Sequence, residues 1–265
     1  MIFKLDYNIT QNRTIQCSEI LNSHLVVLYK YITANNPQWC ARAFNELTYE
    51  LCPEPKLNVL DKFIILAELY SLCFSDNITL QVPGFDGNVV IKTSTMLDNF
   101  YKLKEKWNNV IIDIESIKMT IGIPLELKGS YGLIDYIIEI YGQQINEEIF
   151  NVLPAKAVKE IANYKKYVDD TLKSVITIPE NKNINLTMEC LSIDYILGYL
   201  TRLYSDNLLS FYNLQYQFIT KIGLSYDHFL KLTNAETKIM CNFYESDIKK
   251  QEQEQKNQSN HAYMH

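Results

Sequence analysis

The sequence is poor in the residues that build phosphate-binding loops and metal sites. Its 265 residues include only 8 glycines, 7 prolines and 4 histidines. The glycines are scattered and form neither G-x-x-x-x-G-K-[ST] nor G-x-G-x-x-G, which excludes both common nucleotide-binding motifs. His261 and His265 share helical i,i+4 spacing, but they lie in a polar C-terminal segment, which favours a solvated tail over a metal site. We therefore expect no cofactor and no metal.

The sequence also lacks an excess of positive charge, and it has no long apolar runs. The chain has 25 basic and 31 acidic residues, a net charge of −6, which argues against a protein that binds nucleic acid through its phosphates. Apolar runs such as Phe63–Ala67 are far shorter than the roughly 20 residues that span a bilayer. The first ten residues turn polar at once, unlike a signal peptide. We expect a cytosolic protein without a membrane span.

Catalytic motifs are absent from the sequence as well. There is no G-x-S-x-G elbow, and none of the six cysteines forms a C-x-x-C pair, so we expect reduced and mostly buried thiols. Adjacent acids such as Asp169 and Asp170 point in different directions on a helix and do not converge. We expect a non-enzymatic protein. An enzyme with an unrecognised site is an alternative, and its candidate residues are His24, Cys40, Asp61 and Glu68.

Helical periodicity dominates what is present. Ser18 fits an N-cap, and the apolar spacing after it predicts a helix to about Thr33. Pro37 suits the first turn of a second helix, for which we predict a buried stripe of Trp39, Ala43, Phe44, Leu47 and Leu51. Asn58 fits the cap of a third helix that is apolar on most sides, so we predict that this helix is central and buried.

Short strands and further helices complete the expected fold. Alternation and turn residues predict strands at 2–8, 14–17, 78–82, 89–92, 110–114 and 117–127. Helices are predicted at 95–106, 131–141, 146–152, 155–174, 190–204, 206–222, 226–232 and 234–255, with an irregular or weakly extended segment at 176–188. The fold class is therefore α+β and predominantly helical. We predict an α+β domain with a small antiparallel sheet at 1–128, a helical domain at 129–250 and a disordered polar tail at 251–265.

Aromatic residues are the compositional oddity of the chain, at 12%. Their density in the C-terminal part fits two interpretations: core packing, or a protein-binding surface, since Tyr and Phe are enriched at interfaces. A base-stacking platform needs interleaved cations, which are scarce there. The residues predicted to bind a partner are Phe211, Tyr212, Tyr216, Phe229, Phe243, Tyr244 and Ile248.

Three segments, in this order, resemble the baseplate hub and hub-assembly proteins of T-even-like contractile-tailed bacteriophages. The first is the extended N-terminus that leads into Ser18–Ala34. The second is LNVLDKFIILAELYSLCFSDNITL, from Leu57, which looks like a helix-into-strand step of that family. The third is LSFYNL, from Leu209, followed by SYDHFLKLTNAE, from Ser225, and a charged terminal helix. The chain departs from the family where Tyr70 or Ser71 replaces an arginine, Ser75 or Asp76 a glycine, and Asn234 a proline.

The resemblance implies a structural component or assembly chaperone of the baseplate central hub. Its implied partners are other tail or hub proteins, with the tape-measure protein among them, and its implied place is the cytoplasm of the infected host cell or the virion tail. A helical cytosolic adaptor is a further alternative to this function.

Overall fold

A computed structural model describes most of the chain, and it divides into two compact units. The described residues are 2–5, 14–34, 36–54, 56–81, 88–95, 97–98, 108–171, 173–177, 185–189, 191–194, 196, 198 and 208–262. Unit 1 comprises Met1–Glu19 and Val27–Asp206, and unit 2 comprises Ile20–Val26 and Asn207–His265. The boundary predicted at Lys128 falls inside unit 1, where strands on either side of it pair in one sheet.

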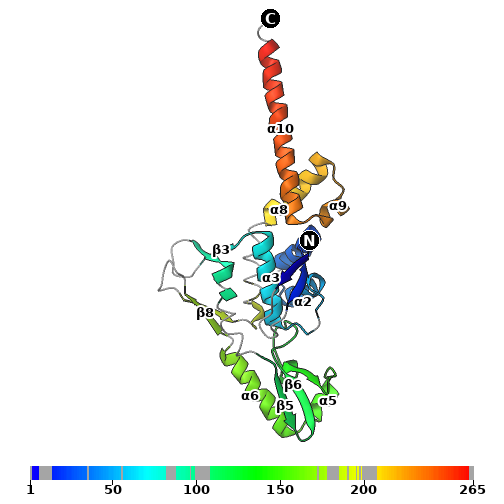
Figure 1. The fold of residues 1–265 in the computed structure, drawn as a ribbon, viewed down its shortest axis with the longest axis vertical. Helices are drawn as coiled ribbons and strands as arrows, with labels where there is room; N and C mark the ends of the chain where they lie inside the picture. Colours follow the sequence, from blue (N-terminus) through cyan, green and yellow to red (C-terminus); the bar gives the residue numbers. More distant parts are fainter. Residues whose placement is uncertain are drawn as a thin grey trace. The chain divides into compact units, whose positions relative to one another are not determined.

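Helices α2 and α3 form the core of unit 1 together with the later half of α1. Their bounds are Asn22–Ala34 for α1, Pro37–Leu51 for α2 and Val59–Cys73 for α3, and α2 lies beside α3 (Figure 1). As predicted, Asn58 caps α3: its side chain accepts from the Asp61 N–H while the Asp61 carboxylate accepts from the Asn58 N–H, a capping box. The predicted burial of α3 is confirmed, since ten of its residues are buried.

The described residues of unit 1 also form four small antiparallel sheets. Strands β1 (Ile2–Leu5) and β2 (Ile15–Ser18) form one pair, β3 (Asn77–Gln81) and β4 (Asn88–Lys92) another, and β8 (Lys173–Thr177) and β9 (Asn185–Glu189) a third. Strands β5 (Val110–Ile114), β6 (Ile117–Ile121) and β7 (Ile137–Ile140) form a three-stranded sheet. The expected class, α+β and predominantly helical with a small antiparallel sheet in the N-terminal half and a helical C-terminal half, is confirmed.

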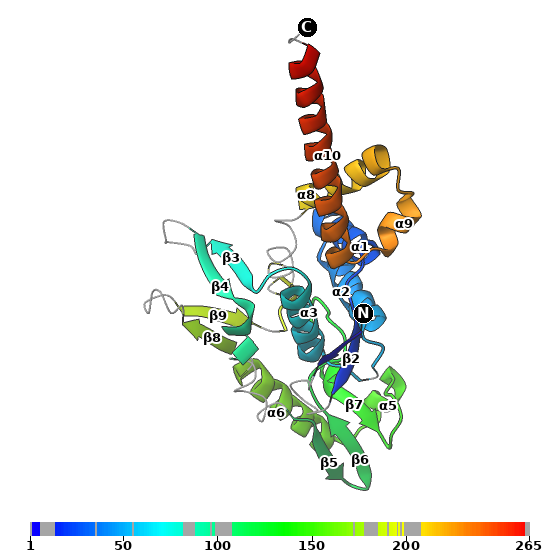
Figure 2. The same ribbon diagram turned by 45° about the horizontal axis from the view of Figure 1, so that its top comes forward.

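Helix α6 (Ala155–Thr171) lies along the three-stranded sheet, as Figure 2 shows. Its buried residues, Ala157, Ile161, Tyr164 and Val168, recur at helical spacing. The Tyr164 ring meets the buried ring of Tyr136 edge to face, with centroids 6.4 Å apart. The short helix α5 (Glu147–Asn151) precedes α6, with the Asn146 side chain as its cap.

Some predicted elements differ from the structure. The helix predicted at 131–141 is a single 3-10 turn, η2 (Leu133–Tyr136), followed by β7, because the run of isoleucines completes the sheet beside β6. The irregular segment predicted at 176–188 includes parts of the paired strands β8 and β9. Most of the helices predicted at 95–106 and 190–204 lies outside the described residues. Trp39 is wrong as a core prediction, since it is 57% exposed.

Unit 2 consists of α8 (Leu208–Gln217), the π-helical turn η3 (Phe218–Ile222), α9 (Tyr226–Lys231), α10 (Asn234–Ala262) and the start of α1. Gly223, with φ of +78°, ends η3 in the left-handed conformation that glycine adopts without strain. In both views, α8 and α9 lie beside the first turns of α10 and the rest of α10 extends past them (Figure 1, Figure 2).

Helix α10 continues into the segment that the sequence predicts to be a disordered tail. It ends at Ala262, so its 29 residues are about 43 Å long at 1.5 Å per residue. Two features favour this extension. The first turn is fixed by a capping box between Thr233 and Glu236, and Lys, Glu and Gln are strong helix formers. Within the described residues, no helix is both long enough and apolar enough to cross a membrane.

Candidate protein-binding surface

The structure separates the seven predicted partner-binding residues into buried, half-buried and exposed groups. Phe211 and Phe229 are buried, at 6% and 0% exposure, and therefore cannot make direct contact with a partner. Tyr212, Tyr216 and Phe243 are 40%, 61% and 68% exposed. Tyr244 and Ile248, on α10, are half-buried. Core packing thus accounts for Phe211 and Phe229, whereas the exposed Tyr212, Tyr216 and Phe243 keep the prediction of a protein-binding surface.

A row of exposed apolar side chains follows one side of α8 and η3. Leu209, Tyr212, Tyr216 and Ile219 recur at spacings of three and four residues, so they share one helix face. We call these four residues the α8 face. Leu209 is 83% exposed, and Ile219 is 36% exposed. Neither was predicted, although their helical spacing with Tyr212 and Tyr216 is visible in the sequence.

The α8 face lies on a part of the chain that has no charge. No Asp, Glu, Lys or Arg occurs between Asn207 and Thr220, and the polar residues there are Ser, Asn, Gln and Thr. Interface cores are depleted of charged residues and enriched in Tyr, because buried charges are costly to desolvate while tyrosine adds area and a hydrogen-bonding tip. The composition of the α8 face is that of an interface core.

A cluster of buried aromatic rings packs beneath the α8 face and holds its helix in place. The Phe229 ring of α9 lies 5.5 Å from Phe211 and 5.7 Å from Phe218, measured between centroids. Phe211 and Phe218 belong to the same helical segment as the exposed row but are buried, at 6% and 1% exposure. Ser225 caps α9 by accepting from the His228 N–H, which fixes the turn that carries Phe229.

A buried asparagine at the start of α1 ties this cluster to α10. The Asn22 amide donates to the Phe229 carbonyl at 2.9 Å and to the Thr237 hydroxyl at 3.1 Å, and its own backbone N–H donates to the Leu232 carbonyl. Asn22 is 2% exposed. These bonds join residues more than 200 positions apart, so residues from both ends of the chain build unit 2.

The first turns of α10 add two exposed apolar residues to unit 2. Ile239 and Phe243 are one helical turn apart and are 53% and 68% exposed. At the start of α10, Glu236 accepts from the Thr233 N–H and, in turn, its own N–H donates to the Thr233 hydroxyl. The hydrogen bond that the Glu236 carboxylate accepts from the Thr233 N–H lowers the pKa of Glu236 below its usual value, so the carboxylate stays charged at the helix N-terminus, where the helix dipole favours it.

Three of the four residues named for an alternative enzyme site, all except Glu68, are shown with backbone partners. His24 accepts from the Leu21 N–H through Nδ1, and Asp61 belongs to the capping box of α3. The Cys40 thiol donates to the Tyr31 carbonyl at 3.1 Å. Burial raises the pKa of Cys40, which disfavours the thiolate that a nucleophile needs. Among the residues that the structure describes, no group of three or more His, Cys, Asp or Glu could hold a metal ion.

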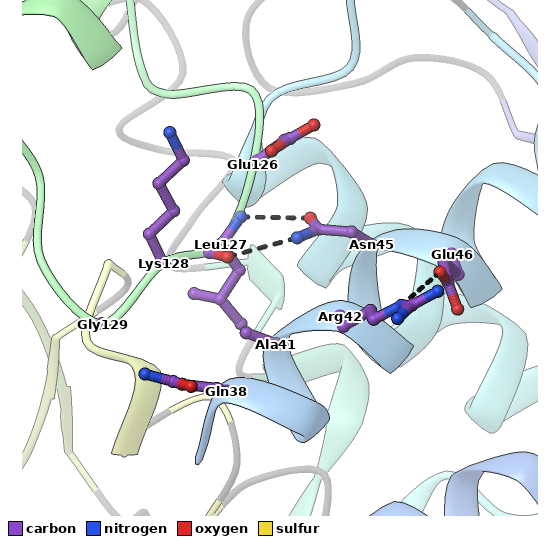
Figure 3. Close-up of a pocket in the computed structure, with 9 residues that line it drawn as sticks. All are labelled: Gln38, Ala41, Arg42, Asn45, Glu46, Glu126, Leu127, Lys128 and Gly129. Atoms are coloured by element: carbon purple, nitrogen blue, oxygen red, sulfur yellow. Dashed lines mark hydrogen bonds and ion pairs between the residues drawn. The ribbon is translucent and has the colours of Figure 1, made fainter.

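A polar cleft of about 450 Å³ lies between α2 and the segment after β6 in unit 1. Figure 3 shows Asn45 of α2 paired with the backbone of Leu127 by two hydrogen bonds, as a neighbouring strand would be. Two cations line the cleft, and both have acidic partners: Arg42 with Glu46 at 2.7 Å, and Lys128 with Asp135 at 2.6 Å.

Lys62 secures the same segment from α3. Its ammonium donates to the Leu125 carbonyl at 2.7 Å and to Asn45 Oδ1 at 3.1 Å. Burial is the largest cause that lowers the pKa of Lys62, from 10.5 to about 8. The partners of the Lys62 ammonium are thus neutral carbonyl and amide oxygens. Because the ammonium is largely buried, the charged form of Lys62 is disfavoured.

This burial predicts a rise in stability with alkaline pH. Because the folded pKa is lowered, the folded protein binds fewer protons than the unfolded chain between pH 8 and 10.5. Below pH 8, Lys62 is charged in both states, and burying this charge lowers the free energy of unfolding. As the pH rises from 8 to 10.5, the folded protein no longer carries the buried charge, and the free energy of unfolding rises by about 3 kcal/mol. Urea unfolding of the wild type and of Lys62→Met at about pH 7 and about pH 10 measures this. Parallel pH profiles for the two proteins would contradict it.

No protein-family model, curated protein or solved structure matches this chain.

Proposed function

We propose that this chain is a non-enzymatic tail protein of a contractile bacteriophage, and that it serves as a structural component or assembly chaperone of the baseplate central hub. The observation that carries the proposal is the α8 face, an uncharged helix surface with four exposed apolar side chains. Such a surface costs free energy in water and is typical of a protein-binding site.

The phage setting is supported by the position of the resembling segments. LSFYNL, from Leu209, contains two residues of the α8 face, Leu209 and Tyr212. The segment from Ser225 to Glu236 contains the cap of α9, the Phe229 ring and the Thr233–Glu236 capping box. The third of the three resembling segments therefore supplies much of unit 2 and part of its exposed surface.

The proposed partners are other baseplate hub proteins or the tape-measure protein. Assembly takes place in the cytoplasm of the infected host cell, and a structural role would also place the chain in the tail of the virion. The α8 face would bind a complementary apolar surface of the partner, since an uncharged patch gives little attraction to a charged one.

The experiment is a pull-down of the tagged chain from cells that make it in its native context, with mass spectrometry of the proteins that co-purify. We expect hub or tape-measure subunits with the wild type and their loss with Leu209→Ser/Tyr216→Ala. A matched control, Leu72→Ser/Tyr49→Ala, removes the same residue types from exposed positions of unit 1. Recovery of no tail protein by the wild type, or equal recovery by both double variants, would contradict the proposal.

A further inference from the structure

A groove of about 590 Å³ lies between α1 and α2 in unit 1. Val27, Tyr31 and Ala34 of α1 share one helix face and form one wall, and Trp39 of α2 forms part of the other. Val27 and Trp39 are 40% and 57% exposed. Tryptophan is among the residues that contribute most binding energy at interfaces. A half-exposed indole beside a groove can therefore contact a large apolar side chain of a partner.

The groove is held open by fixed contacts. The Asn36 side chain caps α2 by accepting from the Gln38 and Trp39 N–H groups at 3.1 and 3.2 Å, which sets the position of the Trp39 backbone. One residue later, the buried Cys40 thiol donates to the Tyr31 carbonyl and joins the two walls. A groove already formed in this way needs little ordering when a partner binds.

The charged residues of the groove are both basic. Lys30 and Arg42 line it together with the four apolar residues, and among the described residues no acid does. This runs against the charge of unit 1: unit 2 contains six lysines and six acidic residues, so the net charge of −6 belongs to unit 1. Arg42 binds Glu46 through Nε, and a guanidinium has further donors on its terminal nitrogens for a second carboxylate.

We propose that this groove is a second protein-binding site, for an acidic amphipathic helix of a partner protein that inserts a large apolar side chain beside Trp39 and places carboxylates against Lys30 and Arg42. A helix fits because an apolar groove with charged margins matches the apolar stripe and polar flanks of an amphipathic helix. The site goes beyond the α8 face, which is uncharged and lies in unit 2.

The experiment uses three short synthetic peptides and the full chain. The first is a helical peptide with a Leu/Phe stripe and Glu elsewhere, the second carries Lys in place of Glu, and the third is a scrambled form of the first that has no stripe. Binding of the labelled peptides is followed by fluorescence anisotropy. We expect the acidic peptide to bind, both others to bind at least about tenfold more weakly, and affinity to fall with salt.

Variants test the residues of the groove. Trp39→Ala should weaken the acidic peptide about thirtyfold, whereas Tyr49→Ala, an exposed aromatic of α2 outside the groove, should leave it unchanged. Lys30→Glu/Arg42→Glu should reverse the preference toward the basic peptide. All the changed side chains are on the surface, and circular dichroism checks the fold. Equal binding of acidic and basic peptides, no binding of either, or no effect of Trp39→Ala would overturn the proposal.

Discussion

Leu209→Ser combined with Tyr216→Ala is expected to weaken binding to the proposed tail-protein partner by at least about a hundredfold. Central aromatic and large apolar contacts each contribute about 2 kcal/mol or more at an interface, which is about thirtyfold in affinity. The two side chains are 83% and 61% exposed, so removing them costs unit 2 little folding free energy. Affinity is measured by titrating the purified partner against the labelled chain.

A folding control must show that unit 2 of this double variant remains folded, so that weaker binding is not caused by unfolding. Amide exchange across α8 and α9 should match that of the wild type, since Phe211, Phe218 and Phe229 are untouched. The control Leu72→Ser/Tyr49→Ala should bind like the wild type. A loss of affinity under about threefold, with unit 2 intact, would show that the α8 face is not the contact.

Asn22→Ala is expected to destabilise the packing of unit 2, although Asn22 is not part of the α8 face. The variant leaves the Phe229 carbonyl and the Thr237 hydroxyl without the Asn22 donor in a buried place. Each group keeps a second partner: the carbonyl still accepts from the Leu232 N–H, and the hydroxyl still donates to the Thr233 carbonyl. The variant therefore loses two hydrogen bonds of about 1 kcal/mol each, about 2 kcal/mol in total. The aromatic cluster then loosens, and partner binding falls with it.

Amide hydrogen exchange measures this local loss of stability in α9 and α10 separately from the rest of the chain. We expect the amides of α9 and of the first turns of α10 to exchange about thirtyfold faster in Asn22→Ala, while those of α3 stay at the wild-type rate. Asn213→Ala is the matched control, because Asn213 is exposed on α8. Unchanged protection of α9 in Asn22→Ala would contradict the role given to this hydrogen-bond network.

Local signals in the sequence predict elements whose residues interact with near neighbours. The cap of α3 by Asn58, the start of α2 at Pro37 and the amphipathic spacing of α6 are all decided within a few residues, and each is found in the structure. The same holds for β3 and β4, since the strands predicted at 78–82 and 89–92 agree with the paired strands to within one residue.

Other features depend on contacts between distant residues and cannot be predicted from periodicity. Spacing shows that Trp39 could join the apolar side of α2, but only the structure shows that it borders a groove instead. The strand β7 forms because β6 offers it a pairing edge. Phe211 and Tyr212 are neighbours in sequence, and the position of Phe229 decides which one is buried.

A photo-crosslinking side chain at position 216 tests directly whether the α8 face contacts a tail protein. The tagged chain, with the photoreactive residue in place of Tyr216, is irradiated in cells that produce it in its native context, and the adducts are identified by mass spectrometry. Tyr141 of unit 1, at 64% exposure, is the control position, matched to Tyr216 at 61%. We predict adducts between position 216 and a hub or tape-measure protein, and none from position 141. The absence of adducts at position 216, or the same adducts at both positions, would contradict the account.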